Sequence, residues 1–278
     1  MKKYSILFLA ILSINSAIAS NWMTSFEDAK KLAMASDKLV LVDFWAIWCG
    51  PCKKMDTESW SKDEVKMLME NYVPVQIDID TNKDLASQYG VKGIPYIFIM
   101  DGNGKVLYNS MSYKRKDEVI SLLNKYAIKM SFLKRDLLNY YQNSSFITSL
   151  RLASKYQDFC LHLNDEIVPD FLGISHDYIK DSKKYLKDSD IENKSVYEQK
   201  IELFEIQEKI ISNHPEKALK MLKKIDAKDI DKNNQSFYSF LTYTAYKQIK
   251  DEENASKWKN DLLESYLNKS DLILKHSS

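Results

Sequence analysis

The sequence predicts a mixed α/β domain over residues 20–128, followed by an all-α helical domain over residues 129–278. Five of the six glycines lie at or before Gly104, so turn-forming residues are concentrated in the first part of the chain. In that part, short apolar or alternating runs typical of strands are separated by helical patterns. Beyond residue 130 the apolar residues recur with helical spacing, and a chain of 278 residues is long enough for both domains.

Helices and strands are expected to alternate in the first domain. Thr24 and Glu27 form a capping-box pattern, which predicts a helix that runs to about Ser36. The continuous apolar run KLVLVDFW at 38–45 predicts a buried central strand. A close pair of cysteines follows this strand and should open the next helix.

The following elements are predicted from caps and alternation. A second capping-box pattern, Ser61 with Glu64, predicts a helix that runs to about Tyr72. The alternating run at 73–80 predicts a strand, and a short helix is expected over 85–89. Two more strands should flank the turn sequence DGNG and form a hairpin.

The last helix of the first domain is predicted over 116–128, and helical patterns continue from there to the end of the chain. Apolar residues lie on two sides of the helix predicted over 193–213, which Pro215 ends. We find no clean repeat period. A helical bundle is therefore the expected arrangement, with a helical-repeat arrangement as the alternative.

Charge argues against nucleic acid as a partner. The net charge is +1, and neither part of the chain is basic. Residues 20–128 carry 14 Lys and Arg against 15 Asp and Glu, and residues 129–278 carry 24 Lys and Arg against 24 Asp and Glu. Neither domain has the positive excess that binding to phosphates requires.

The first 19 residues resemble a signal for export. Lys2 and Lys3 precede an apolar stretch, and the small residues Ala17 and Ala19 predict cleavage before Ser20. An uncleaved membrane anchor is the alternative, although the apolar stretch is shorter than the ~20 residues that span a bilayer. We therefore expect an exported, periplasmic protein in which residues 1–19 are a signal peptide.

The cysteine pair Cys49 and Cys52 in the sequence CGPC carries the strongest chemical signal. A bridge across two residues closes almost no loop, so it adds little stability. A cysteine at the start of a helix faces unpaired N–H groups and the positive end of the helix dipole, which lower its pKa and favour the reactive thiolate. We expect Cys49 to attack a target disulfide and Cys52, one turn further in, to resolve the mixed disulfide.

The two residues between the cysteines suit this exchange. Gly50 lets a target chain approach closely, and Pro51 is tolerated in the first turn of a helix and stiffens it. Half of a zinc site is the alternative interpretation of the pair, but Cys160 and His162, the candidates to complete it, lie in the other domain and should point to different faces. We expect no metal.

Residues 22–128 resemble the thioredoxin family. The segment LVDFWAIWCGPCK is similar to the family's active-site segment, and YGVKGIPYIFIMDGNGKV (89–106) is similar to its later segment. The interval from Cys52 to Pro95 is 43 residues, close to the family's spacing. The helical domain resembles no family that we can name.

The resemblance implies roles for individual residues. Pro95 should form a cis peptide bond and, with Ile94, shape the groove where a target peptide lies. Trp45 and Trp48 match tryptophans beside the family's active site, and Asp43 matches the buried acid that exchanges a proton with the resolving cysteine. An acid buried in an apolar strand has a raised pKa, which suits proton transfer; a purely structural polar residue is the alternative for Asp43.

Two positions depart from the family pattern. Gln76 stands where the family has a lysine near the buried acid, so proton handling should differ. Thr57 replaces the proline that bends the active-site helix. The stretch CKKMDTESWSKDEV instead resembles thioredoxin-like C-terminal domains of periplasmic electron-transfer proteins.

These observations predict an exported thiol–disulfide oxidoreductase that reduces disulfides of periplasmic proteins. The Gly-Pro dipeptide resembles reducing members of the family, and such a reductase needs an electron donor, expected to be a membrane protein. The chain lacks a glycine-rich nucleotide fingerprint, so we expect no cofactor. A thiol oxidase or isomerase is one alternative, and a non-catalytic binding or chaperone module is another.

The remaining residues add little to this hypothesis. Cys160 lies among apolar residues and is expected to be buried as a small hydrophobic side chain, with an intermolecular bridge or a regulatory thiol as the alternatives. The helical domain is expected to bind a protein partner or to dimerise.

Overall fold

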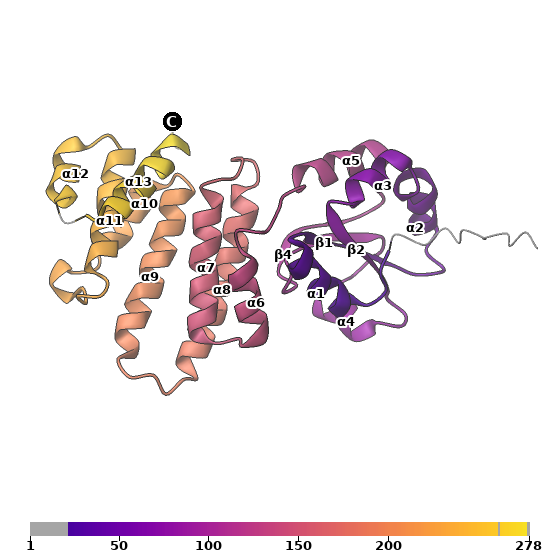
Figure 1. Cartoon of the computed structure of the whole chain (residues 1–278), viewed down its shortest axis with the longest axis horizontal. Helices are drawn as coiled ribbons and strands as arrows, with labels where there is room; N and C mark the ends of the chain where they lie inside the picture. Colours follow the sequence, from indigo (N-terminus) through magenta and orange to yellow (C-terminus); the bar gives the residue numbers. More distant parts are fainter. Residues whose placement is uncertain (1–21, 261, 277–278) are drawn as a thin grey trace, which may run out of the picture.

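The computed structural model describes residues 22–260 and 262–276 (Figure 1). The expected signal peptide, residues 1–19, lies outside these residues. The N-terminal part contains α1 (Phe26–Ser36), β1 (Leu39–Trp45), α2 (Gly50–Met55), the π-helix η1 (Asp56–Trp60), α3 (Asp63–Met69), β2 (Tyr72–Asp78), α4 (Lys83–Gln88), β3 (Tyr96–Met100), β4 (Val106–Met111) and α5 (Lys116–Lys125). The predicted order of helices and strands is confirmed, with the π-helix η1 as an added element between the two helices expected after β1.

The four strands form one mixed sheet in the order β2-β1-β3-β4. β1 pairs in parallel with β2 and antiparallel with β3, and β3 pairs antiparallel with β4. Buried side chains of α1 and α4 pack on one face of the sheet, and those of α2, η1, α3 and α5 pack on the other. Because both faces of β1 are covered, its sequence reads as a continuous apolar run.

Asp43 is the one acidic residue in that run. Leu39 and Leu41 of β1 lie on the face packed by α2 and α3, and Asp43 follows on the same face because side chains alternate along a strand. The strand therefore places a carboxyl group beneath the start of α2.

Both expected capping boxes are wrong. Ser25, not Thr24, caps α1, and its hydroxyl accepts a hydrogen bond from the Asp28 N–H at 3.2 Å. Ser61 is the C-terminal cap of η1, and its hydroxyl donates to the Thr57 carbonyl at 2.8 Å. The active-site helix continues as a π-helix through residues 56–60, so α3 begins only at Asp63.

Two predicted helix ends also differ from the structure. Tyr72 begins β2 rather than ending a helix, because it pairs with Leu39 at the start of β1; its buried hydroxyl donates to the Leu123 carbonyl. The helix expected over 116–128 ends at Lys125, since the next residues turn into the connection to the helical part.

The C-terminal part contains helices throughout. They are α6 (Lys134–Gln142), α7 (Phe146–Cys160), α8 (Val168–Lys187), α9 (Lys194–Ile211), α10 (Pro215–Leu222), the 3₁₀ helix η2 (Ala227–Asp229), α11 (Gln235–Gln248), α12 (Glu252–Lys259) and α13 (Glu264–His276). Each helix of the described chain is too short or too polar to cross a membrane.

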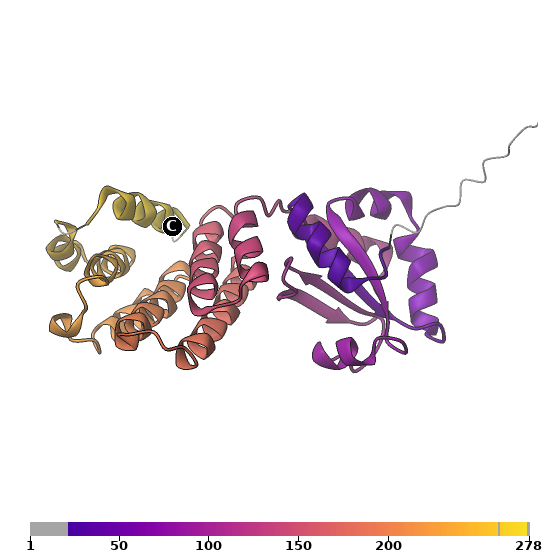
Figure 2. The ribbon, with the colours of Figure 1, turned by 60° about the horizontal axis from the view of Figure 1, so that its bottom comes forward.

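The helices stack in sequence order. α7 pairs with α8, α9 with α10 and α11 with α12, while α9 also contacts α7 and α11, and α11 contacts α13. Figures 1 and 2 show this succession as an open row that leads away from the sheet. The arrangement therefore corresponds to the helical-repeat alternative rather than to the bundle that the missing sequence period favoured.

The two parts share one core. A single cluster of contacting buried side chains includes Leu41 in the sheet, Leu133 in the connection and Tyr156 in α7. Figure 2 shows the helical part against the β4 side of the α/β part. The connection between the parts is thus packed rather than a free linker.

A buried carboxylate lies at the centre of this junction. Asp101, in the turn between β3 and β4, is fully buried. Its Oδ2 accepts hydrogen bonds from the hydroxyls of Tyr156 at 2.8 Å and Tyr178 at 2.7 Å, and its Oδ1 accepts from the backbone N–H groups of Asn103 and Lys105. One side chain thus fixes both the hairpin turn and two helices of the C-terminal part.

Candidate active site

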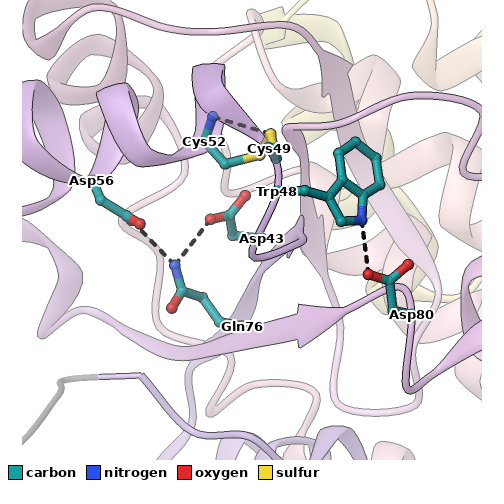
Figure 3. Close-up of a disulfide and its surroundings, with 7 residues drawn as sticks. All are labelled: Asp43, Trp48, Cys49, Cys52, Asp56, Gln76 and Asp80. Carbon is teal, nitrogen blue, oxygen red and sulfur yellow. Dashed lines mark hydrogen bonds between the residues drawn. A yellow bond between two sulfur atoms is a disulfide. The ribbon is translucent and has the colours of Figure 1, made fainter.

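Cys49 and Cys52 form a disulfide at the N-terminus of α2 (Figure 3). Cys49 is the N-cap residue, and its sulfur accepts a hydrogen bond from the Cys52 N–H at 3.1 Å. When the bridge is reduced, the same N–H group and the helix dipole stabilise a thiolate on Cys49. The structure thus places Cys49 where the sequence predicts the nucleophile.

The disulfide has little exposed surface. Cys49 is 2% exposed and Cys52 is 3% exposed, so burial does not distinguish the two residues in this oxidised form. Their different positions in the helix do: Cys49 sits at the cap, and Cys52 lies within the first turn. The expected difference in reactivity therefore rests on the helix terminus rather than on solvent access.

The predicted groove residues surround the disulfide. Ile94 packs against the cluster that the two cysteines form with Ala46, and the Ile94–Pro95 peptide bond is cis, as the resemblance implies. Pro51 lies in the first turn of α2 and is exposed. Next to it, a Cβ atom on Gly50 would meet no heavy atom within 4 Å, so the surface there is open to an approaching chain.

Trp48 forms an exposed wall of the site. Its side chain is among the exposed large hydrophobic residues at 64%, and its indole N–H donates to Asp80 Oδ2 at 2.8 Å. The hydrogen bond fixes the ring while its apolar surface stays in solvent (Figure 3). Trp45, at the end of β1, packs against the cysteine cluster instead.

Asp43 lies beneath the disulfide and is 2% exposed. Its Oδ2 accepts a hydrogen bond from Gln76 Nε2 at 3.2 Å, while its other oxygen, Oδ1, is buried without a hydrogen-bond partner. Burial raises the pKa of Asp43 to about 7; the Gln76 hydrogen bond opposes this shift and the nearby Asp56 charge adds to it. A group with this pKa can give or take a proton near neutral pH.

Asp56 is a site residue that sequence reasoning missed. It begins η1, and its Oδ1 accepts from the same Gln76 nitrogen at 3.3 Å. Burial raises the pKa of Asp56 as well. Its position four residues after Cys52 was a usable signal, because residues four apart in a helix lie on the same side.

The structure does not support the zinc alternative. Cys160 is the last residue of α7, in the helical part, whereas Cys49 and Cys52 are bonded to each other at the N-terminus of α2, which Figure 1 shows on the side of the α/β part away from the helices. Cys160 is 1% exposed, and burial raises the pKa of its thiol. It therefore has the environment of a buried small hydrophobic side chain, as predicted.

Comparison with known proteins agrees with this geometry. The thioredoxin family model matches residues 21–125. Thioredoxin of Bacillus subtilis (strain 168) is 35% identical over 99 residues, which span 34% of this chain and 88% of that protein. Thioredoxin of Rickettsia conorii (strain ATCC VR-613 / Malish 7) is 36% identical over 109 residues, which span 39% of this chain and 98% of that protein.

This chain belongs to the thioredoxin family. Among solved structures, the oxidised C-terminal domain of Neisseria meningitidis DsbD aligns at 28% identity and a TM-score of 0.32, covering 37% of this chain and 98% of that one. The match to the thioredoxin model ends at residue 125, before the helical part begins.

Family membership and the cysteine pair together establish a thiol–disulfide oxidoreductase. In the thioredoxin part, the Cys49–Cys52 pair accepts two electrons as the disulfide and donates two as the dithiol. Thioredoxins act on disulfides of proteins, so protein disulfides are the substrate class. The proton-transfer role of Asp43 and the contacts of the groove residues with a target stay predictions.

The Asp43 carboxyl group should make folding stability depend on pH. In the unfolded chain its pKa returns to 3.8, against about 7 in the folded protein, so the folded state binds the proton more tightly. Stability therefore falls as the pH rises from about 4 to 7. We expect Asp43→Asn to raise the free energy of unfolding at pH 8 by up to about 4 kcal/mol and to change it little below pH 4.

Urea unfolding of the oxidised protein at pH 4 and pH 8 measures this effect. Asp63→Asn, which removes an exposed carboxylate from α3, is the matched control and should leave stability within about 0.5 kcal/mol of the wild type at both pH values. An equal gain for Asp43→Asn at both pH values would show that ionisation is not the cause.

Proposed function

We propose that this protein is an exported reductase of periplasmic protein disulfides, supplied with electrons by a membrane protein. The observation that carries the proposal is the Cys49–Cys52 disulfide at the N-terminus of α2, with Ile94 packed against it and the cis peptide bond beside it. The signal-like pattern of residues 1–19 supports export, and the Gly50-Pro51 dipeptide, which resembles that of reducing thioredoxins, supports the direction.

The reaction proceeds by two thiol exchanges. The Cys49 thiolate attacks one sulfur of the target disulfide, forms a mixed disulfide and releases the other sulfur as a thiolate. Cys52 then loses its proton to Asp43 and attacks the Cys49 sulfur. This second step releases the target's remaining thiolate and closes the Cys49–Cys52 bridge; the released thiolates take protons from solvent.

The donor reverses this chemistry. A dithiol of the donor passes two electrons to the Cys49–Cys52 bridge, the donor's own disulfide forms, and Cys52 regains a proton from Asp43. Trp48 and the open surface at Gly50 offer an apolar contact where either partner can lie while the sulfurs exchange.

Cys52→Ala should trap the partners. Without Cys52 the mixed disulfide on Cys49 has no internal thiol to resolve it, so we expect target proteins to stay covalently bound in the native host. Mass spectrometry of the trapped species should recover exported proteins and a membrane protein, all released by reducing agent. Cys49→Ser combined with Cys52→Ala is the control and should trap none.

Two results would contradict the proposal. Recovery of cytoplasmic proteins alone would contradict export. So would finding the protein in the cytoplasm with residues 1–19 still attached. A strongly oxidising reduction potential for the Cys49–Cys52 pair would favour the thiol oxidase or isomerase instead. An unchanged cellular phenotype when both cysteines are serine would favour a binding module.

A further inference from the structure

Two carboxyl groups share one amide beneath the disulfide. Asp43 Oδ2 and Asp56 Oδ1 accept hydrogen bonds from the same nitrogen of Gln76, at 3.2 and 3.3 Å. An amide NH₂ group has two hydrogens, so each carboxyl group takes one. Figure 3 shows Gln76 between the two acids, with the Asp43 carboxyl group between Gln76 and the disulfide.

Among the described residues, α2 carries two lysines, Lys53 and Lys54, but both are exposed, and the charge that acts on the Asp43 carboxyl group is that of Asp56. β2 contributes the neutral Gln76, β3 contributes Ile97 as the paired residue, and α2 contributes the two sulfur atoms. η1 contributes Asp56, which is the charged neighbour that acts on Asp43. Two like charges held by one neutral donor repel each other, so the pair favours keeping a single proton.

Of the two acids, Asp43 is the one whose protonated form burial favours more strongly. Asp43 is 2% exposed, whereas Asp56 is half-buried, so water stabilises the ionised form of Asp56 better than that of Asp43. Gln76 occupies Oδ2 of Asp43, which leaves the unpartnered Oδ1 to carry the proton.

We propose that Asp56 and Gln76 are positioning residues that act through Asp43 and set the pH range in which Asp43 exchanges its proton with Cys52. Gln76 holds both acids in place, and the Asp56 charge makes Asp43 a stronger base. Asp43 can then take the Cys52 proton when the mixed disulfide is resolved and return it when the bridge is reduced. This inference rests on the redox cycle proposed above.

Asp56→Asn tests the charge without removing the hydrogen bond, because the asparagine side-chain oxygen can accept from Gln76 as the carboxylate does. We expect the pKa of Asp43, measured by carboxyl ¹³C NMR in the oxidised protein, to fall by on the order of one pH unit. The midpoint of the pH dependence of mixed-disulfide resolution should fall by a similar amount.

Three further variants make the test specific. Asp56→Glu restores a charge and should restore both midpoints towards the wild type. Gln76→Lys places a cation between the acids and should lower the Asp43 pKa further than Asp56→Asn does. Asp63→Asn removes an acid from α3 outside this cluster and should move neither midpoint.

The outcomes separate this inference from the proposed function. Unchanged Asp43 titration in Asp56→Asn, or an equal shift in Asp63→Asn, would overturn the inference while the wild type still reduced disulfides. Conversely, a wild type that released no thiols from disulfide substrates would defeat the proposed function. The Asp43 shift in Asp56→Asn would then still support the electrostatic coupling.

Discussion

Cys49→Ser should reduce the rate of thiol release from a disulfide-bonded protein such as insulin to the uncatalysed background, a fall on the order of 10³ or more. The serine hydroxyl is similar in size to the thiol but remains protonated at neutral pH. The sulfur of Cys49 accepts a hydrogen bond from the Cys52 N–H at the helix N-terminus, but even there the serine hydroxyl cannot replace a thiolate. Turbidity or thiol titration with a chemical reductant as electron donor measures the loss.

Cys160→Ser is the matched control for this prediction. Cys160 lies buried at the end of α7, and burial raises the pKa of its thiol, so it should take no part in exchange. We expect Cys160→Ser to retain the wild-type rate. Retained activity in Cys49→Ser, or a comparable loss in Cys160→Ser, would contradict the assignment of the nucleophile.

Asp101→Ala should lower the free energy of unfolding of the full chain by about 3 kcal/mol or more. The substitution leaves the hydroxyls of Tyr156 and Tyr178 without their acceptor inside the junction. Each buried donor without a partner costs about 1–3 kcal/mol. The turn between β3 and β4 loses its two side-chain-to-backbone hydrogen bonds at the same time.

The control for this loss is an exposed ion pair at the same junction. Glu166 pairs with Lys125 at 3.2 Å, but its side chain is 70% exposed, so Glu166→Ala should cost less than about 1 kcal/mol. Tyr178→Phe, which removes one of the two hydroxyls, should give an intermediate loss. Urea unfolding followed by circular dichroism orders the three variants, and equal losses for Asp101→Ala and Glu166→Ala would contradict the role of the buried carboxylate.

Local sequence patterns were sufficient for the redox pair and the strands beside it. The pair follows a run that is apolar because both faces of β1 are covered, and a cysteine at the end of such a strand falls at a helix N-terminus. Glycine and proline marked the hairpin and the loop before β3. Glycine permits, and proline restricts, backbone conformations whatever the distant contacts are, so both signals are local.

The spacing of Asp56 from Cys52 was a local signal, but the joining of Asp56, Gln76 and Asp43 into one cluster was not predictable from such patterns. Asp56 caps α2 and donates its N–H to the Cys52 carbonyl, but its contact with Gln76 of β2 joins residues 20 apart, which no local pattern links. Ser61 and Glu64 match a capping-box pattern, but Ser61 instead caps the C-terminus of the π-helix η1. Sequence showed that Gln76 replaces a lysine, but not that a second acid takes part.

The junction between the two parts depends on contacts distant in sequence. Asp101 meets Tyr156 and Tyr178 across separations of 55 and 77 residues, so no local pattern links them. The stacking of the helices likewise depends on contacts between successive helix pairs. The sequence has no clear repeat period, so these contacts could not be predicted from it.

The packed junction sets the reach of the enzyme. Figure 1 shows α2, which carries the disulfide at its N-terminus, on the side of the α/β part away from the helices, and the shared core holds the two parts together. A molecule bound to the helical row would therefore have to extend past the sheet to meet the disulfide.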